Sequence, residues 1–423
     1  MAQFSARMRV FLVNTGTELL LGDVRDAHLS FIAQQILPFG LRIAEQRTVP
    51  DGPAIRNTLE QISSRADLVF VTGGLGPTSD DITRDLVAEL LGLDLIPDEG
   101  VLAAIRERLS KRAIKITDSI LRQADAPRGA QILPNAFGTA PGLFLRAGIN
   151  SSLSSPHFFL LPGPPRELQP MFRESVLPIL HSLAPESNKV VRRIYKIANV
   201  GESVVEAAVG ARLLAVPGLE VGYCARPGEV DLRIVGDLAA IDAGGAIIMD
   251  SLGDSIFTDT DQTLEEVIVQ TLKERHETLA VAESCTGGLL AHRLTNVPGA
   301  SGVFLAGYVT YSNEAKSDLL KVEATLIEKH GAVSAEVARA MAEGARARCG
   351  ATHAVATTGI AGPDGGSPEK PVGTVFVGLA TRKGGTVSRK FFFPTDRETF
   401  KQMVAQAAFE LLRKADSSSI QNQ

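Results

Sequence analysis

The sequence predicts an α/β protein with two doubly wound α/β domains joined by a small α+β connector. In residues 1–186, short apolar runs that end in glycine or proline alternate with segments of helical period, which is typical of a parallel sheet. Residues 187–259 show a different pattern, and the alternation resumes in residues 260–423. A chain of 423 residues is long enough for two or three such domains.

In the first domain, the compact apolar runs are expected to be buried strands and the periodic segments to be helices. Leu29, Ile32 and Ile36 recur at helical spacing, and Gly40 ends that helix. The predicted strands are MRVFLVNTG, LRIAEQRTV, DLVFVTGG and HFFLLPGPP, and two further predicted helices are AIRNTLEQISSRA and ITRDLVAELLG.

The connector and the last domain follow from turn and capping signals. The sequence EVGYCARPGEVDLRIV contains two alternating runs around Pro227-Gly228, which predicts a hairpin. Thr263 and Glu266 have the spacing of a capping box and open a new helix. The predicted strands after it are LAVAES, GVFLAGYVTYS, HAVATTG and GTVFVGLAT, with helices near residues 289–295, 335–348 and 399–414.

The composition excludes several classes of function. The net charge of −5 and the scattered lysines and arginines favour neither a nucleic-acid partner nor a membrane surface. Cys224, Cys285 and Cys349 lie far apart without a CxxC spacing, so neither a zinc site nor a disulfide framework is expected. No apolar run approaches the ~18 residues of a membrane span. The expected location is the cytoplasm.

A glycine-rich segment, FVTGGLGPTSDDITRD, follows the third predicted strand. Gly73 and Gly74 allow the backbone to approach a ligand closely, and the next helix offers free N–H groups to a phosphate. The spacing matches neither a P-loop nor a dinucleotide fingerprint. Asp80 and Asp81 have two interpretations: a helix N-cap with a dipole-favoured acid, or a carboxylate that holds Mg²⁺ against a pyrophosphate.

A second polar segment lies where the strand LAVAES meets glycines and a helix. There Ser284 is placed as a nucleophile, and the backbone amides of the turn are expected to face a developing oxyanion. His292 is about two turns along the next helix and points away, so Lys316 is the candidate base. Cys285 is a competing nucleophile, although a small buried hydrophobe is the commoner fate of a cysteine. An isolated lysine at a helix start is likewise more often solvated.

A second glycine-rich loop follows the strand that ends at Thr357 and Thr358. Its glycines can wrap a phosphate or ribose, or can simply serve as turn residues in a mobile loop. Two glycine-rich strand ends in one α/β unit fit a cleft at the carboxyl edge of the sheet. The glycines of this loop are Gly359, Gly362, Gly365 and Gly366.

The motifs TGGLGPTSDDIT, NTGTELLLG and LLPGPPREL resemble the molybdopterin-binding-like domain in the N-terminal half of the CinA family (competence/damage-inducible proteins). The resemblance implies a metal-dependent ADP-ribose pyrophosphatase. It places a divalent ion, Mg²⁺ or similar, on Asp80 and Asp81, and Asp81 aligns with the acid of the family motif. The implied nucleotide-binding residues are Gly73, Gly74, Gly76, Thr78, Pro162 and Gly163.

The motifs AESCTGG, YVTYSNEAK, HGAVS and TGIAGPDGG resemble the C-terminal domain of the same family, a nicotinamide-nucleotide amidohydrolase, over nearly all of residues 262–415. The resemblance implies that Ser284 is the nucleophile and Lys316 the general base, with no cofactor. It also implies a homodimer. The implied substrate-binding residues are Tyr311, Thr286, Gly287, Gly288, Thr358, Gly359, Gly362 and Arg397.

Two functions of different classes follow. The first is a bifunctional hydrolase of pyridine-nucleotide salvage, which converts nicotinamide mononucleotide (NMN) to nicotinic acid mononucleotide and ammonia and also cleaves ADP-ribose. The alternative is a non-catalytic molybdopterin- or nucleotide-binding protein that acts in competence or in the DNA-damage response. The pairing of Ser284 with Lys316 favours the enzyme, because a pure binding protein needs neither residue.

Overall fold

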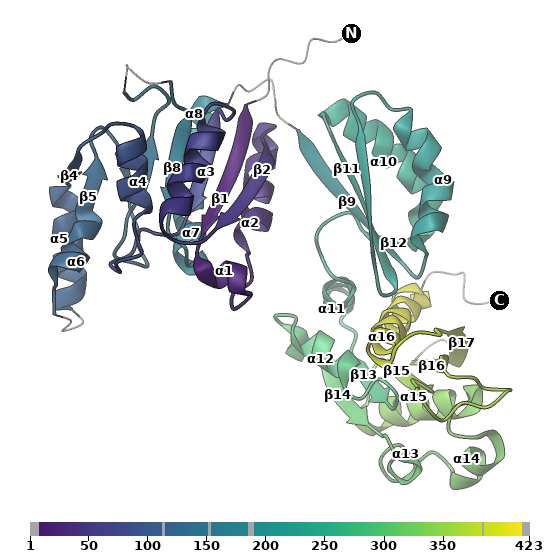
Figure 1. The fold of residues 1–423 in the computed structure, drawn as a ribbon. Coiled ribbons are helices and arrows are strands. Elements are labelled where there is room, and N and C mark those ends of the chain that lie inside the picture. Colours follow the sequence, from purple (N-terminus) through teal and green to yellow (C-terminus); the bar gives the residue numbers. More distant parts are fainter. Residues whose placement is uncertain (1–7, 112–114, 151–153, 185–189, 383–384, 417–423) are drawn as a thin grey trace. The chain divides into compact units, whose positions relative to one another are not determined.

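The computed structural model describes residues 8–111, 115–150, 154–184, 190–382 and 385–416. The chain divides into two compact units, residues 1–191 and residues 192–423 (Figure 1). The second unit contains two separate sheets. The predicted domain boundaries at residues 186/187 and 259/260 stay predictions.

The first unit is built on a six-stranded sheet in the order β2-β1-β3-β8-β7-β6. The neighbours β2, β1, β3 and β8 run parallel, as predicted, whereas β8, β7 and β6 pair antiparallel. These last strands follow one another without a long helix between them, and a parallel crossover needs such a connection. The strand bounds are β1 (Arg9–Thr15), β2 (Arg42–Val49), β3 (Leu68–Thr72), β6 (Gln131–Leu133), β7 (Gly142–Leu145) and β8 (His157–Leu161).

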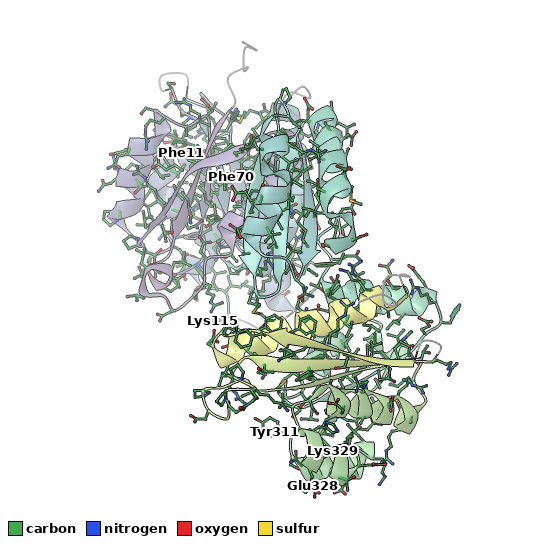
Figure 2. The ribbon with its side chains drawn as sticks, turned by 90° about the vertical axis from the view of Figure 1, so that its right-hand side faces the viewer. Phe11, Phe70, Lys115, Tyr311, Glu328 and Lys329 are labelled. Atoms are coloured by element: carbon green, nitrogen blue, oxygen red, sulfur yellow. The ribbon has the colours of Figure 1, made fainter. Side chains whose placement is uncertain are left out.

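Helices cover both faces of this sheet because its strands are apolar on both sides. Phe11 packs in one core cluster with α3, whereas Phe70 packs in the other with α2, and Figure 2 shows both rings on the sheet. The helix bounds are α1 (Thr17–Leu21), α2 (His28–Ile36), α3 (Pro53–Ser63), α4 (Thr83–Leu90), α7 (Pro165–Met171) and α8 (Leu177–Leu183).

A small lobe of the first unit lies between α4 and β6. It contains helix α5 (Glu99–Ser110), helix α6 (Asp118–Leu121) and an antiparallel pair, β4 (Leu95–Pro97) with β5 (Asp125–Pro127). Its apolar cluster consists of Val101, Ile105, Leu109 and Ala124.

The first sheet of the second unit has the order β10-β11-β9-β12. Strands β10 and β11 form the predicted hairpin, with Arg226 opposite Glu229 and Gly228 in the turn at a φ of 75°. The element bounds are β9 (Val191–Ala198), α9 (Glu202–Leu214), β10 (Glu220–Arg226), β11 (Glu229–Gly236), α10 (Leu238–Leu252) and β12 (Ile256–Thr258).

The second sheet of this unit has the order β14-β13-β15-β16-β17. Strands β14, β13 and β15 run parallel, whereas β15, β16 and β17 run antiparallel, and β17 was not predicted. The strand bounds are β13 (Leu279–Glu283), β14 (Phe304–Val309), β15 (His353–Gly359), β16 (Thr374–Thr381) and β17 (Gly385–Phe392).

The helices around the second sheet begin and end near the predicted places. The capping box is confirmed, because the Thr263 N–H donates to Glu266 at 2.6 Å and the Glu266 N–H donates to Thr263 at 3.4 Å. Among the described helices, none is both long and apolar enough to cross a membrane. The helix bounds are α11 (Leu264–Glu274), α12 (Leu289–Thr295), α13 (Asn313–Leu320), α14 (Ala324–His330), α15 (Ala335–Cys349) and α16 (Arg397–Arg413).

Candidate functional site

Ser284 and Lys316 meet at the carboxyl edge of the second unit's parallel strands. Ser284 follows β13 directly, and Lys316 lies in the first turn of α13, which follows β14 after a short connection. Because β13 and β14 are parallel neighbours, both segments leave the sheet at the same edge. The Lys316 Nζ lies 3.3 Å from the Ser284 Oγ, so the two predicted catalytic groups are within hydrogen-bond distance.

The Lys316 amine is enclosed by the chain, and the side chain is only 1% exposed. It donates to the carbonyl oxygens of Thr310 at 3.0 Å and of Tyr311 and Ser312 at 3.3 Å each. Desolvation lowers the pKa of Lys316, and the nearby Cys285 and Glu314 oppose that shift. The solvated lysine that is usual at a helix start is therefore not found here.

Cys285, the residue after Ser284, is buried. Its thiol packs in an apolar cluster with Val375, Phe400 and Val404, and burial raises the pKa of the thiol to about 12. A thiol with such a pKa is almost entirely protonated at neutral pH and is a poor nucleophile. Of the two neighbouring candidates, the serine is the one whose hydrogen bond to the lysine the structure describes.

The backbone amides that begin α12 do not face an oxyanion, and that expectation is wrong for these groups. The buried Glu283 carboxylate accepts from the N–H groups of Gly288 at 3.0 Å, Leu290 at 3.1 Å and Ala291 at 2.9 Å. An acid at the helix N-terminus satisfies donors that would otherwise be free. The signal in the sequence was an acid at a strand end just before a glycine turn and a helix.

Tyr311 and Arg397 come together although 86 residues separate them. The Arg397 guanidinium donates to the Tyr311 hydroxyl at 2.9 Å and to the Gly362 carbonyl at 2.8 Å. Tyr311 is 60% exposed, and Figure 2 shows it at the edge of the second unit. Three predicted substrate-binding residues from three separate segments thus form one cluster next to the segment that holds Lys316, with Tyr311 and Arg397 exposed and Gly362 buried.

The other predicted substrate-binding residues shape the backbone. The Thr286 hydroxyl is buried and hydrogen-bonds the Thr357 hydroxyl at 2.8 Å, and the Thr358 hydroxyl donates to the Ala332 carbonyl at 2.7 Å. Three glycines have positive φ and one lies against the neighbouring strand, where a side chain would collide with Val375. The positive-φ residues are Gly287, Gly288 and Gly362, and the packed one is Gly359.

The predicted glycine-rich loop of the first unit lines a cavity of about 500 Å³. Gly73 and Gly74 have φ values of 96° and 68°, and a side chain on Gly73 would lie 2.6 Å from the Thr15 carbonyl. Glycine is required at both positions by conformation and by close packing. Of the predicted nucleotide-binding residues, the cavity wall includes Gly73, Gly74, Gly76, Pro162 and Gly163.

Asp80 and Asp81 both line this cavity, but neither is an N-cap. Helix α4 is preceded by Ile82, which makes no side-chain capping bond, so the capping interpretation is wrong. The Asp81 carboxylate accepts instead from the Thr78 N–H at 2.9 Å and from the Thr78 hydroxyl. Asp80 is exposed, and its pKa is lowered by a hydrogen bond from Thr78. Thr78 therefore orients the acidic pair and does not itself line the cavity.

Among the described residues that line this cavity, the charged groups able to bind a metal ion are carboxylates. Among the residues that the structure describes, no group of three or more His, Cys, Asp or Glu side chains is placed to hold a metal ion. Magnesium is commonly held by one or two carboxylates together with substrate phosphates, so two neighbouring aspartates suit it. The further acids on the wall are Glu18, Asp51 and Glu167.

Several wall residues were not predicted, because they come from a loop without a recognisable motif. Asn135 holds that loop: its side chain accepts from the Gly138 N–H at 2.7 Å and donates to Glu167 at 2.9 Å. Phe137, which is 55% exposed, lies on the cavity wall with Arg108. His28, which interacts with the Gly163 backbone, has its pKa lowered by burial.

Both units match models of known protein families. Residues 12–182 match the model of a probable molybdopterin binding domain, and residues 261–415 match the CinA C-terminal domain. A CinA-like protein of Akkermansia muciniphila is 45% identical over 402 residues, which covers 95% of this chain and 96% of that protein. A competence-damage inducible protein of Moorella thermoacetica is 42% identical over 413 residues, with 96% and 98% covered.

Solved structures are similar to part of the chain. The crystal structure of the competence/damage inducible protein CihA from Agrobacterium tumefaciens is 40% identical, with a TM-score of 0.35, and covers 36% of this chain and 92% of its own. The whole-length relatives cover both units in one alignment, at identities well above 30%. The chain therefore belongs to the CinA family.

Proposed function

We propose that the second unit is a nicotinamide-nucleotide amidohydrolase, which converts NMN and water to nicotinic acid mononucleotide and ammonia. The observation that carries this proposal is the buried Lys316 amine 3.3 Å from the Ser284 hydroxyl. A serine needs a base to attack an amide, and a lysine in a desolvated position can supply one. The resemblance of the surrounding motifs to the family's amidohydrolase domain supplies the substrate class.

The reaction proceeds in two stages. Ser284 Oγ attacks the amide carbon while Lys316 takes the hydroxyl proton, and the C–N bond then breaks as Lys316 returns that proton to the leaving ammonia. Water attacks the resulting ester with Lys316 again as base. The acid is released and Ser284 recovers its proton. Every proton taken up by the lysine is returned within the cycle.

The surroundings of Lys316 suit both halves of this cycle. Desolvation lowers the pKa of the amine and so raises the fraction of neutral base. The three carbonyl oxygens around the Nζ accept hydrogen bonds from the ammonium form and stabilise it once the proton has arrived. The amine is thereby held in place for both proton transfers.

The test of this proposal is to measure ammonia release from NMN by the whole chain. Nicotinamide riboside, which lacks the phosphate, is assayed in parallel. We expect NMN turnover that persists in the presence of a chelator. Binding of NMN without ammonia release would favour the non-catalytic alternative, in which the chain acts as a nucleotide-binding protein in competence or DNA damage.

For the first unit, we propose a metal-dependent ADP-ribose pyrophosphatase. The supporting observation is a glycine-walled cavity with two neighbouring carboxylates, Asp80 and Asp81. These residues would hold the divalent ion, which would supply charge neutralisation at the pyrophosphate. The test is AMP release from ADP-ribose with Mg²⁺ or Mn²⁺, which EDTA should abolish while NMN hydrolysis continues.

A further inference from the structure

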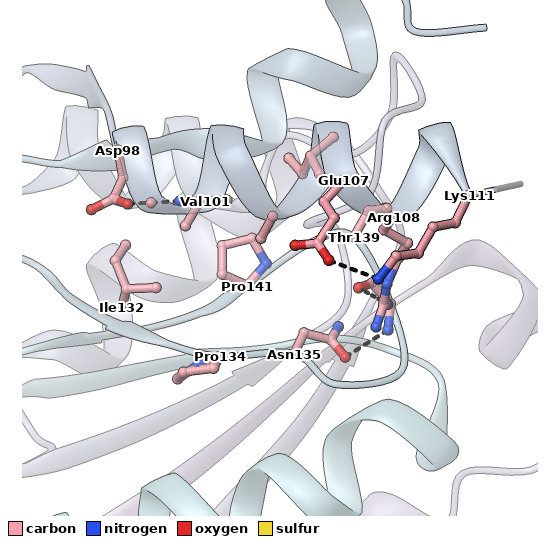
Figure 3. Close-up of a pocket in the computed structure, with 14 residues that line it drawn as sticks. Asp98, Val101, Glu107, Arg108, Lys111, Ile132, Pro134, Asn135, Thr139 and Pro141 are labelled. Atoms are coloured by element: carbon pink, nitrogen blue, oxygen red, sulfur yellow. Dashed lines mark hydrogen bonds and ion pairs between the residues drawn. The ribbon is translucent and has the colours of Figure 1, made fainter. Parts of the chain in front are cut away.

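A second cavity of about 650 Å³ lies in the small lobe of the first unit and has no role in the functions proposed so far (Figure 3). It lies between one side of α5 and the segment of residues 132–141. Its volume is within the range of cavities that hold small ligands. It is therefore large enough for a nucleoside.

The wall of this cavity is apolar in its middle and polar at its ends. Val101 and Ile105 from α5 lie opposite Ile132, and two prolines, Pro134 and Pro141, extend the apolar surface. At one end, Asp98 uses a single carboxylate oxygen to accept from the Val101 N–H at 2.9 Å. An apolar space beside a carboxylate acceptor suits a base that carries an amino group.

The loop that closes the cavity is already fixed. The Asn135 side chain donates to the Ala140 carbonyl at 2.7 Å and accepts from the Phe137 N–H at 3.0 Å, so it bridges the loop. The Arg108 guanidinium reaches from α5 to the carbonyls of Ala136 and Gly138 (Figure 3). A ligand here would lose little affinity to ordering of the wall.

The two cavities of the first unit share a border. Arg108, Gly138 and Thr139 line both the second cavity and the one with the glycine-rich loop. A ligand that passes this border would have one end at the glycines and acids and the other between α5 and the prolines. The guanidinium at the border adds positive charge near the middle of such a ligand.

We propose that the second cavity binds the base and ribose of a nucleotide whose phosphates lie at the glycine-rich loop. This inference rests on the proposed pyrophosphatase function and deepens it, because it assigns recognition of the base to a separate wall. Selectivity for a base-bearing diphosphate over a simple sugar phosphate would then come from the small lobe.

Helix α5 offers a matched pair of variants for the test. Ala104 lines the cavity, whereas Ala103, its neighbour on the same helix, does not, and both are exposed. Ala104→Trp should fill the cavity, and Ala103→Trp is its control. The chain has no tryptophan of its own, so the emission maximum reports directly whether the new indole is enclosed.

The measurement is calorimetric titration of both variants and the wild type with AMP and with ribose 5-phosphate. We expect Ala104→Trp to weaken AMP binding by about tenfold or more, the usual loss when a pocket no longer admits a group. Ribose 5-phosphate should bind equally to all three proteins, and Ala103→Trp should match the wild type with both ligands.

Three results would overturn the assignment. The first is no AMP binding by the wild type, and the second is unchanged AMP binding by an Ala104→Trp variant whose indole is enclosed. The third is that Phe137→Ala loses AMP binding while Ala104→Trp keeps it. The last result would place the base on the exposed ring in the glycine-rich cavity. If AMP and ribose 5-phosphate bind to the variants as expected but the protein does not hydrolyse ADP-ribose, the base site is supported and the proposed pyrophosphatase activity is contradicted.

Discussion

The two candidate sites differ in how much of their chemistry the chain supplies itself. In the second unit, Lys316 is enclosed by carbonyl oxygens and lies 3.3 Å from Ser284. In the first unit, Asp80 is exposed and Asp81 bonds only to Thr78 among the hydrogen bonds that the structure describes. In the proposed reactions, the first site would need a cation and a substrate to complete it, whereas the second already holds Ser284 and Lys316 together.

The difference shows how each site is stabilised. A buried amine is tolerated because several acceptors surround it, and those acceptors fix its position before any substrate arrives. Two neighbouring carboxylates at an open cavity repel each other unless solvent or a cation screens them. The activity of the proposed amidase site should therefore depend on exact side chains, and that of the proposed pyrophosphatase site on charge.

The largest expected effect is that of Ser284→Ala, which removes the nucleophile. NMN hydrolysis should fall by about 10⁴–10⁶-fold, as in other enzymes that lose a nucleophilic serine. Cys285→Ala is the control, and it should keep most of the activity because the thiol is buried and protonated. Ammonia release measures both. An inactive cysteine variant beside an active serine variant would reverse the assignment of the nucleophile.

The next effect concerns the base. Lys316→Arg and Lys316→Ala should both lose on the order of 10²–10⁴ in kcat, because guanidinium does not deprotonate in the accessible range. Since burial lowers the pKa of Lys316, wild-type kcat should rise with pH through one ionisation below the ~10.4 of a free lysine.

The kcat–pH profile and NMN affinity by calorimetry check this prediction. NMN affinity should fall much less than the rate in both variants. An active arginine variant would show that Lys316 supplies only positive charge.

A smaller effect is expected for Asp81→Asn in the first unit. The amide can still accept from the Thr78 N–H, so the loop is kept while the charge is lost. ADP-ribose cleavage should fall on the order of 10²-fold, since a bound cation stabilises charge by several kcal/mol. Asp80→Asn serves as the parallel variant, and NMN hydrolysis should be unchanged in both. Wild-type cleavage rates in Asp81→Asn would remove this acid from the site.

The smallest effect tests the exposed part of the amidase site. Arg397→Lys cannot bond both the Tyr311 hydroxyl and the Gly362 carbonyl as the guanidinium does. The KM for NMN should rise about tenfold with kcat nearly unchanged, since uniform binding is lost. Steady-state kinetics measure this, with the exposed Arg348→Lys as control. A fall in kcat without a change in KM would place Arg397 in the chemical step instead.

Much of the fold was predictable because strands and helices alternate with clear periods. Strand β17 was missed because three consecutive polar residues, Ser388, Arg389 and Lys390, interrupt its apolar pattern. Antiparallel pairing at the far edge of each sheet depends on connection length and partner choice, which local patterns do not carry.

The amino acids of the second unit's site were predictable where they lie at or soon after a strand end. Ser284 follows β13 directly and Lys316 lies in the helix after β14, and the structure brings them together. The direction of the α12 amides was predicted wrongly, because the side chain of Glu283 accepts from them before any ligand can. Arg108 and Asn135 were missed because tertiary contacts alone place them at the cavities.

The Glu283 carboxylate at the start of α12 affects the orientation in which a substrate binds. NMN has a phosphate at one end and an amide at the other, and a helix N-terminus ordinarily attracts the phosphate. Here the chain's own anion already holds the amides of Gly288, Leu290 and Ala291, one residue from Ser284. If NMN is the substrate as proposed, its phosphate would be repelled from the serine and attracted to Arg397, so the reversed, unproductive orientation would be disfavoured before binding is complete.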